Sequence, residues 1–190
     1  MSKVITFSRK FPAYHTKAGQ PTFFVEQVLN SLGIDTIGRE YILNLQRWNI
    51  KALEAKKITP YDLIEFQHSL NNLVSGEKKH TIRSGDRWKN GQKASLRVWS
   101  GKPYRSTQII FAPEVDLNQT GKFVIKKYQT YTYINIGKIF CYPIPFIHEQ
   151  SIISSVAIND GLNKNDFLEW FKYPTPFNGQ ILCWKEVFYG

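Results

Sequence analysis

The sequence is poor in the residues that build disulfide frameworks, metal sites and membrane spans. Its 190 residues include two cysteines and four histidines, and none of them lie at metal-ligand spacing. Cys141 and Cys183 are therefore expected to be reduced, buried thiols. No stretch approaches the roughly 20 apolar residues of a membrane helix, and the opening MSKVITFSRK has no apolar signal core. We expect a soluble, cytoplasmic protein without metal, cofactor or membrane association.

Acidic residues are also scarce, and their scarcity is local. The chain has 25 Lys and Arg against 15 Asp and Glu, a formal net charge of +10. Residues 76–138 alone hold 13 of the basic and 4 of the acidic side chains. A region of one charge sign attracts polyanions, so RNA, or a smaller nucleoside or nucleotide, is the first partner to consider. A basic surface without a function is the alternative, because a high pI alone is weak support.

Hydrophobic and aromatic residues are plentiful, and their spacing predicts helices first. Apolar positions recur at helical spacing over 24–32, and Gly33 follows as a C-terminal cap. A second helix is expected over 38–56. A third is expected to begin at Thr59 and Pro60, where threonine caps and proline occupies the first turn, and to run toward residue 73.

After Gly76 the pattern becomes typical of strands. Runs rich in β-branched and aromatic residues predict strands at 80–83, 94–100, 107–111, 122–136 and 180–184, in addition to an opening strand at 4–7. The turn 101–103 is expected to form a hairpin, and two more helices are expected at 152–158 and after Asn163. The pattern predicts an α+β fold: a small β-barrel with flanking helices and a helical insertion after its first strand.

Three motifs resemble the ASCH domain of the PUA-like superfamily. They are ITFSRKF near the start, KKHTIR after Gly76, and INDGLNKNDFLEWF near the end. The resemblance covers about 1–12 and 74–190, with 20–73 as an N-terminal helical insertion in a single domain, 1–190. It implies a compact barrel that binds RNA or a modified nucleotide in a cleft.

One branch of this family is similar in motif to N4-acetylcytidine amidohydrolases, which use a lysine, a threonine and a glutamate. The K-x-x-T-I-R pattern places the first two at Lys78 and Thr81, and the acidic position falls on Asp160. Here aspartate stands where the family has the longer glutamate. The resemblance implies an alternative function, removal of an acyl group from an N4-acylated cytidine-type nucleoside. Thr81 would then be the nucleophile, Lys78 its base, and Asp160 the acid near the leaving amine.

Strand alternation gives two possibilities for the lysine. If the strand included Lys79, then Lys79 and Thr81 would share a face and Lys78 would point away. The family assignment needs the strand to begin after Lys78, so that this lysine turns inward. We adopt Lys78 and keep Lys79 as the alternative.

The remaining candidates are basic and aromatic residues that suit single-stranded nucleic acid, because cations hold phosphates while aromatic faces stack bases. The candidate nucleic-acid-binding residues are Lys79, Arg83, Arg87, Trp88, Lys89, Tyr104 and Arg105. Trp99 is expected in the core, whereas Trp88 could be buried or stack a base. A third hypothesis is a protein-interaction module that uses the helical insertion, with Trp48 as its anchor.

Overall fold

A computed structural model of the chain describes residues 2–127, 132–137, 149–172, 176–187 and 189. Within them the fold is α+β, as predicted. The helices are α1 (Phe24–Ser31), α2 (Arg39–Trp48), α3 (Ile50–Glu54), α4 (Pro60–His68), α5 (Glu149–Asn159) and α6 (Lys164–Trp170). The strands are β1 (Lys3–Thr6), β2 (His80–Ser84), β3 (Lys93–Trp99), β4 (Gln108–Ile110), β5 (Val115–Asp116), β6 (Gln119–Lys127), β7 (Thr132–Ile136) and β8 (Phe177–Cys183). None of the described helices is long and apolar enough to cross a membrane.

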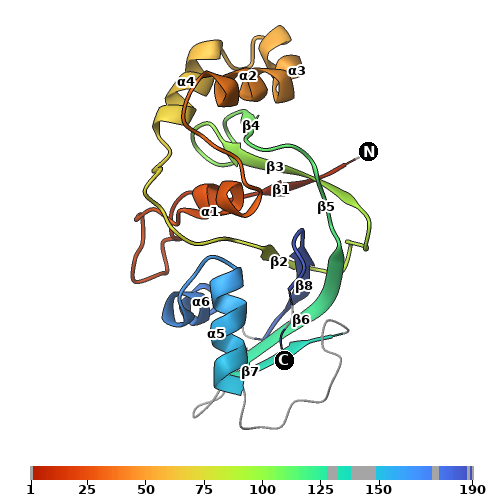
Figure 1. Cartoon of the computed structure of the whole chain (residues 1–190). Helices are drawn as coiled ribbons and strands as arrows, with labels where there is room; N and C mark the ends of the chain where they lie inside the picture. Colours follow the sequence, from red (N-terminus) through yellow and green to blue (C-terminus); the bar gives the residue numbers. More distant parts are fainter. Residues whose placement is uncertain (1, 128–131, 138–148, 173–175, 188, 190) are drawn as a thin grey trace.

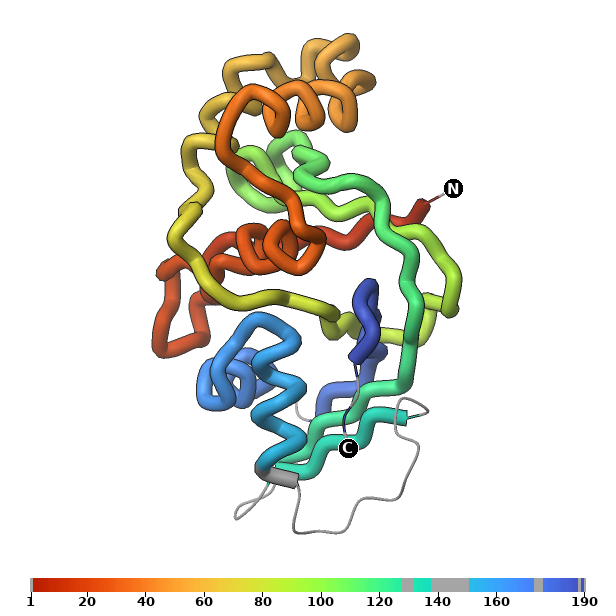
Figure 2. The backbone as a smooth tube through the Cα atoms, viewed as in Figure 1, coloured from red at the N-terminus to blue at the C-terminus, as the bar shows by residue number. Residues whose placement is uncertain are grey.

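The described strands form two sheets, whereas the sequence predicted one small closed barrel. In the first sheet, β3 pairs with β1 in parallel and with β4 and β5 antiparallel. The second sheet is antiparallel in the order β2-β8-β6-β7. The chain passes from the first to the second through β5 and β6 (Figures 1 and 2). Between β1 and β2 the connection is made by a side chain, because Arg83 donates a hydrogen bond to the Thr6 carbonyl at 2.7 Å.

The helices form two groups. In Figure 1, α2, α3 and α4 lie together at the end of the molecule beyond the first sheet, and α5 and α6 lie beside the second sheet. Helix α1 lies between these groups. The core is continuous across both parts, and it includes Tyr41 and Leu63 of the helical region together with Leu96 and Phe123 of the sheets.

A buried asparagine divides the helix predicted over 38–56. Asn49 separates α2 from α3, and its side-chain amide donates to the carbonyls of Leu45 and Ile110 at 2.8 Å each. The Asn49 side-chain oxygen accepts from the backbone N–H of Ile110, also at 2.8 Å. The side chain thus substitutes for a strand partner of β4, and the helix is interrupted where this clamp forms.

The start of α4 confirms the predicted cap. Thr59 accepts a hydrogen bond from the backbone N–H of Asp62, the Asp62 side chain accepts from the Thr59 N–H, and Pro60 occupies the first turn. This reciprocal capping box satisfies two of the donors that a helix start leaves free.

The predicted long strand 122–136 is wrong as a single element. Strands β6 and β7 are antiparallel, with Phe123 opposite Ile136 and Lys127 opposite Thr132, so the chain reverses between them. Alternating Tyr and Thr residues are compatible with a strand but do not show where it turns. Of the two cysteines, Cys183 is a free buried thiol whose pKa burial raises to about 12, while Cys141 lies outside the described residues.

The close pairing of β2 and β8 predicts a stability change at Gly179. A methyl group added there would meet the carbonyl oxygen of Arg83 inside van der Waals contact. Gly179→Ala is expected to lower the free energy of unfolding by roughly 1–3 kcal/mol, because the two backbones must move apart. Chemical denaturation measures this change. Gly101→Ala is the control, since its new methyl would lie 3.4 Å from Ser106, and equal stability of the two variants would contradict the packing argument.

Candidate functional site

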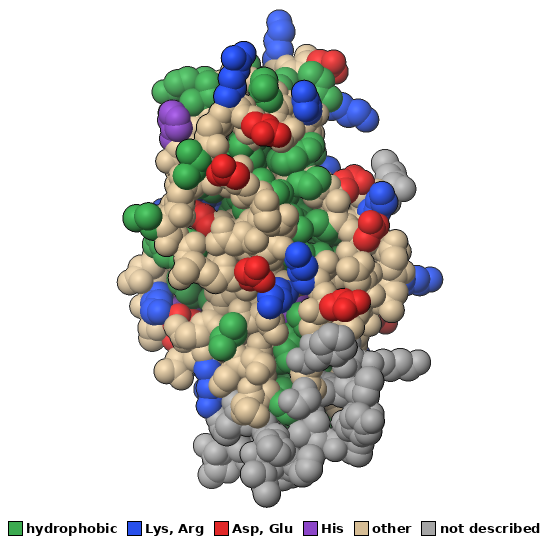
Figure 3. All heavy atoms as spheres, in the orientation of Figure 1, with side chains coloured by type: hydrophobic (Ala, Val, Ile, Leu, Met, Phe, Trp, Pro, Cys, Tyr) green, Lys and Arg blue, Asp and Glu red, His purple; other side chains and the backbone are tan. Residues whose placement is uncertain are grey.

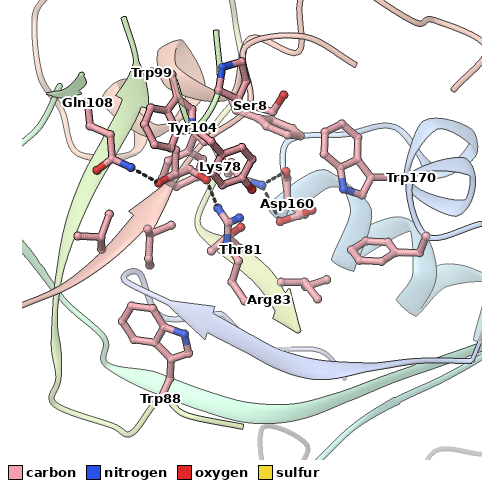
Figure 4. A pocket seen from close by; sticks show the side chains of 18 of the residues that line it. Ser8, Lys78, Thr81, Arg83, Trp88, Trp99, Tyr104, Gln108, Asp160 and Trp170 are labelled. Atoms are coloured by element: carbon pink, nitrogen blue, oxygen red, sulfur yellow. Dashed lines mark hydrogen bonds and ion pairs between the residues drawn. The ribbon is translucent and has the colours of Figure 1, made fainter. Parts of the chain in front are cut away.

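A cavity of about 540 Å³ lies between β1 and β2, and we call it the site cavity. Its walls come from both sheets, from the start of α1, from the end of α5 and from the loop between β3 and β4. The three residues proposed for catalysis, Lys78, Thr81 and Asp160, all line it. Figure 4 shows Lys78 and Asp160 facing one another in this cavity.

Backbone hydrogen bonds to α1 and α5 hold the segment that carries Lys78. The segment before β2 runs past α1 (Figure 2), where Asn30 of α1 donates to the carbonyls of Val74 and Gly76. The N–H of Lys78 then donates to the carbonyl of Gln27 at 3.0 Å, and the N–H of Lys79 donates to Asn159 of α5 at 2.8 Å. Strand β2 begins only at His80.

This geometry distinguishes the two lysines. Lys78 is 1% exposed and faces the cavity. Lys79 is partly exposed and lies 3.6 Å from Glu77 in an ion pair at the surface. The structure therefore has the arrangement that the Lys78 assignment requires.

Three groups surround the Lys78 ammonium. Its Nζ lies 2.6 Å from Oδ1 of Asp160, donates to the Asp160 backbone carbonyl, and sits 4.2 Å from the centre of the Phe24 ring. A cation over an aromatic face is attracted by the ring quadrupole. Because both charges of the pair are buried, its strength depends on this complete set of partners.

The turn that ends α5 places Asp160. Gly161 follows with a φ of +79°, a left-handed conformation that glycine adopts without penalty. A side chain at this position would also collide with Oε1 of Gln27. The glycine of the DGL motif is thus favoured by the turn itself, while a larger residue would also force the Gln27 side chain of α1 to move.

Burial and pairing set the charges of this cluster. Burial lowers the pKa of Lys78 to about 8, against the opposing attraction of Asp160. Burial alone would raise the pKa of the Asp160 carboxyl, but the Lys78 charge and the nearby His80 outweigh it, and the pKa is lowered. His80 is fully buried with Nδ1 3.5 Å from Oδ1 of Asp160, and burial lowers its pKa, so the ring is neutral near pH 7.

Thr81 and Arg83 extend the cluster along β2. The buried Thr81 lines the cavity two residues before Arg83. Arg83 packs over the Phe7 ring at 5.5 Å and is partly buried. Besides its hydrogen bond to Thr6, it forms no ion pair within the described residues, and its Nε is buried without a hydrogen-bond partner. Arg83 thus lines the cavity with its charge unpaired and one buried N–H unbonded among the described residues.

Aromatic side chains form much of the remaining wall. The rings of Trp99 and Tyr104 lie 5.3 Å apart (Figure 4), and Tyr104 is 89% exposed in a left-handed conformation with a φ of +62°. Trp99 is only partly buried, so its predicted core position is wrong. Trp88 is 3% exposed, and its backbone is fixed to β8 through the side-chain amide of Gln180.

Four of the seven predicted nucleic-acid-binding residues line the cavity: Arg83, Arg87, Trp88 and Tyr104. Lys79, Lys89 and Arg105 do not. On the face in Figure 3, basic and acidic side chains are interspersed. Some of the basic residues of 76–138 therefore line the cavity, and others lie on the surface.

Sequence reasoning missed Phe24, Gln108 and Trp170 as cavity residues. Phe24 belongs to the apolar stripe of α1, and Trp170 ends an amphipathic helix, so both patterns indicated core. Phe24 is buried as that pattern indicated and Trp170 is partly buried, and the packing of α1 and α6 brings both rings to the cavity wall. Phe171, predicted as core in the same motif, is buried.

Trp48 and His15 have structural positions. Trp48 is half-buried and packs edge-on against Tyr41 at 6.2 Å, which favours a packing role over that of an interaction anchor. His15 is buried and stacks on Phe11. In the part of the chain that the structure describes, no group of three or more His, Cys, Asp or Glu side chains could hold a metal ion.

Comparisons with protein-family models, with curated proteins and with solved structures found no match to this chain.

The buried ion pair predicts a large, coupled stability effect. Asp160→Asn leaves the Lys78 ammonium without its counter-charge and is expected to lower the free energy of unfolding by about 3–5 kcal/mol. Lys78→Met should cost a similar amount because it strands the carboxylate. The double variant should cost clearly less than the sum of the two. Denaturant titration measures all three.

Lys79→Met is the matched control for this cycle. Its partly exposed pair with Glu77 should contribute no more than about 1 kcal/mol. Strict additivity of the two buried substitutions would show that Lys78 and Asp160 do not depend on one another.

Proposed function

We propose that the site cavity binds the base of an RNA or of a modified nucleotide, and that the chain is a PUA-like protein of the ASCH type. The observation that carries the proposal is the side-chain set in one cavity: an arginine that forms no ion pair with the described residues, a buried Lys–Asp pair and several aromatic rings. Charged groups buried beside an open cavity cost stability, and such arrangements cluster at functional sites.

The size and chemistry of the cavity suit a nucleoside. Pockets for small ligands usually enclose about 300–1,000 Å³, and this cavity has about 540 Å³. Arg83 can donate to a carbonyl or ring nitrogen of a base, and Asp160 can accept from an exocyclic amine. Trp99 and Tyr104 offer faces on which a base can stack.

The phosphate would then lie at the rim. Lys78 is too deeply buried and too fully paired to meet a phosphate. Arg87 is exposed and lines the cavity, with its guanidinium 5.9 Å from the Trp88 ring. A nucleotide would be oriented with its base toward Asp160 and its phosphate toward Arg87.

Substitution of the exposed ring tests base binding. Tyr104→Ala should weaken binding of single-stranded RNA roughly 5- to 150-fold, because stacking of one base on an aromatic ring is worth about 1–3 kcal/mol. Fluorescence anisotropy at several salt concentrations measures the affinity, which should fall as salt rises. Tyr61→Ala removes a ring that is 65% exposed on α4 and does not line the cavity, and it serves as the control. Unchanged RNA affinity in Tyr104→Ala, or affinity that ignores salt, would contradict the proposal.

An amidohydrolase acting on an N4-acylated cytidine-type nucleoside is the second candidate. The observation that favours it is the lowered pKa of Lys78 on the same cavity as the Thr81 hydroxyl. A lysine activates a hydroxyl only when it is neutral, and a pKa of about 8 makes the neutral form accessible near physiological pH.

In this candidate reaction, Lys78 takes the Thr81 proton as the hydroxyl oxygen attacks the acyl carbonyl. The carbon–nitrogen bond then breaks, Lys78 returns the proton to the leaving amine, and water hydrolyses the acyl ester on Thr81. The lowered pKa of Asp160 keeps it an ionised acceptor at neutral pH. We therefore assign Asp160 the role of holding Lys78, in place of the proton donor that the family motif led us to expect.

The hydrolase candidate has a matched pair of variants. Incubation with N4-acetylcytidine should release cytidine, and Thr81→Val should abolish release while Thr81→Ser, which keeps a hydroxyl, should retain it. The rate should rise with pH through about 8 and then level off, because Lys78 loses its proton over that interval. Chromatography of the nucleosides measures release. Turnover that survives in Thr81→Val, or a rate that falls across this interval, would refute the assigned roles.

A further inference from the structure

A second cavity of about 480 Å³ adjoins the site cavity. The two share a wall made by Phe7, Ser8, Phe24, Trp99 and Pro103, since all five residues line both. The partition between them is therefore mainly aromatic and apolar. A ligand that lies against one face of this partition has a second hollow immediately beyond it.

The wall of the second cavity away from the partition comes from other parts of the chain. The start of α1 contributes Phe23 and Glu26, the segment after β1 contributes Arg9 and Lys10, and the segment after α4 contributes Asn71. None of these residues lines the site cavity. The second cavity thus combines a ring, a carboxylate and two cations.

Each cavity is lined by one aromatic residue with a positive φ angle. Among the described residues other than glycine, Phe23, Lys56 and Tyr104 have positive φ, at 57°, 52° and 62°. A left-handed conformation is unfavourable for bulky side chains and persists where the surroundings enforce it, often at functional sites. Phe23 lines the second cavity and Tyr104 the site cavity. Each hollow therefore has one aromatic residue held in this unusual conformation.

The polar groups of the second cavity match the parts of a nucleotide. Glu26 accepts a hydrogen bond from the backbone N–H of Asn71 at 3.3 Å, and it can also accept from an exocyclic amine of a base. Its negative charge disfavours a phosphate beside it. Arg9 is held over the Phe66 ring and donates to the Ser69 carbonyl, while Lys10 is exposed. These two cations provide the nearby place for a phosphate.

We infer that the second cavity is a subsite for the neighbouring nucleotide of a single-stranded RNA, so that successive bases occupy the two sides of the Trp99 partition. The inference rests on the proposed nucleotide binding in the site cavity and defines its ligand as an oligonucleotide rather than a free nucleoside. Base stacking on Phe23 supplies affinity, and the Glu26 carboxylate favours a base with an exocyclic amine.

The test separates the two cavities by ligand length. Isothermal titration with the four ribonucleoside 5′-monophosphates reports on the site cavity, and titration with the four ribo-homotetramers reports on both. The wild-type chain should bind its preferred tetramer at least roughly tenfold more tightly than the corresponding monophosphate, the amount expected from one additional stacked base.

Substitutions at Phe23 identify the source of that gain. Phe23→Leu and Phe23→Asn should lose most of the tetramer's affinity advantage over the monophosphate, while their affinity for the monophosphate stays within about twofold of wild type. Phe23→Tyr should keep that advantage. Asparagine tolerates the left-handed conformation and caps helices well, so the second variant should fold even if leucine is strained. Circular dichroism checks folding, and Tyr61→Ala, which lines neither cavity, is again the control.

The outcomes distinguish the two proposals. Tetramer affinity equal to that of the monophosphate, or a tetramer gain that survives in both Phe23→Leu and Phe23→Asn, overturns the second subsite and leaves base binding in the site cavity intact. Absence of binding by every monophosphate and every tetramer overturns the proposed nucleotide binding and the subsite with it. Loss of the gain in the two variants, with retention in Phe23→Tyr, supports the subsite.

Discussion

The buried pair of Lys78 and Asp160 is the interaction around which this fold is arranged. Two opposite charges can lie in a protein interior only if each is met by the other and by further hydrogen bonds. That requirement brings together the segment before β2 and the end of α5, with Phe24 of α1 over the ammonium. Gly161 then forms the turn after Asp160 with a φ of +79°, a conformation that favours glycine.

The separation of the two sheets follows from the same arrangement. A closed barrel would pair β1 with β2 through backbone hydrogen bonds, whereas here the Arg83 side chain reaches Thr6 and leaves a hollow between the strands. Strands β1 and β2 are not paired with one another, and a cavity lined by charged and aromatic groups lies between them. Helix α1 and the β3–β4 loop close the hollow on its other sides.

The helical region contributes to the site indirectly. Asn49 and Tyr41 hydrogen-bond to the backbone of Ile110 and Phe111, and Thr107 donates to the carbonyl of Lys57. These bonds fix the β3–β4 hairpin, whose loop carries the ring of Tyr104 against Trp99. The helices therefore support the aromatic walls of both cavities, which gives the region a structural role besides any contact with a partner protein.

The sequence by itself determined most of the local structure. Periodicity and caps located α1, α4 and α6, and the K-x-x-T-I-R and Asp-Gly-Leu motifs identified residues that prove to share one cavity. Local patterns could not show that Asn49 divides a helix, that 122–136 contains two strands, or that Trp88 is buried while Trp99 is only partly buried. Those outcomes depend on contacts between residues distant in the chain. Whether a ring is wall or core, and which of two adjacent lysines turns inward, was decided only by how α1, β2 and α5 pack together.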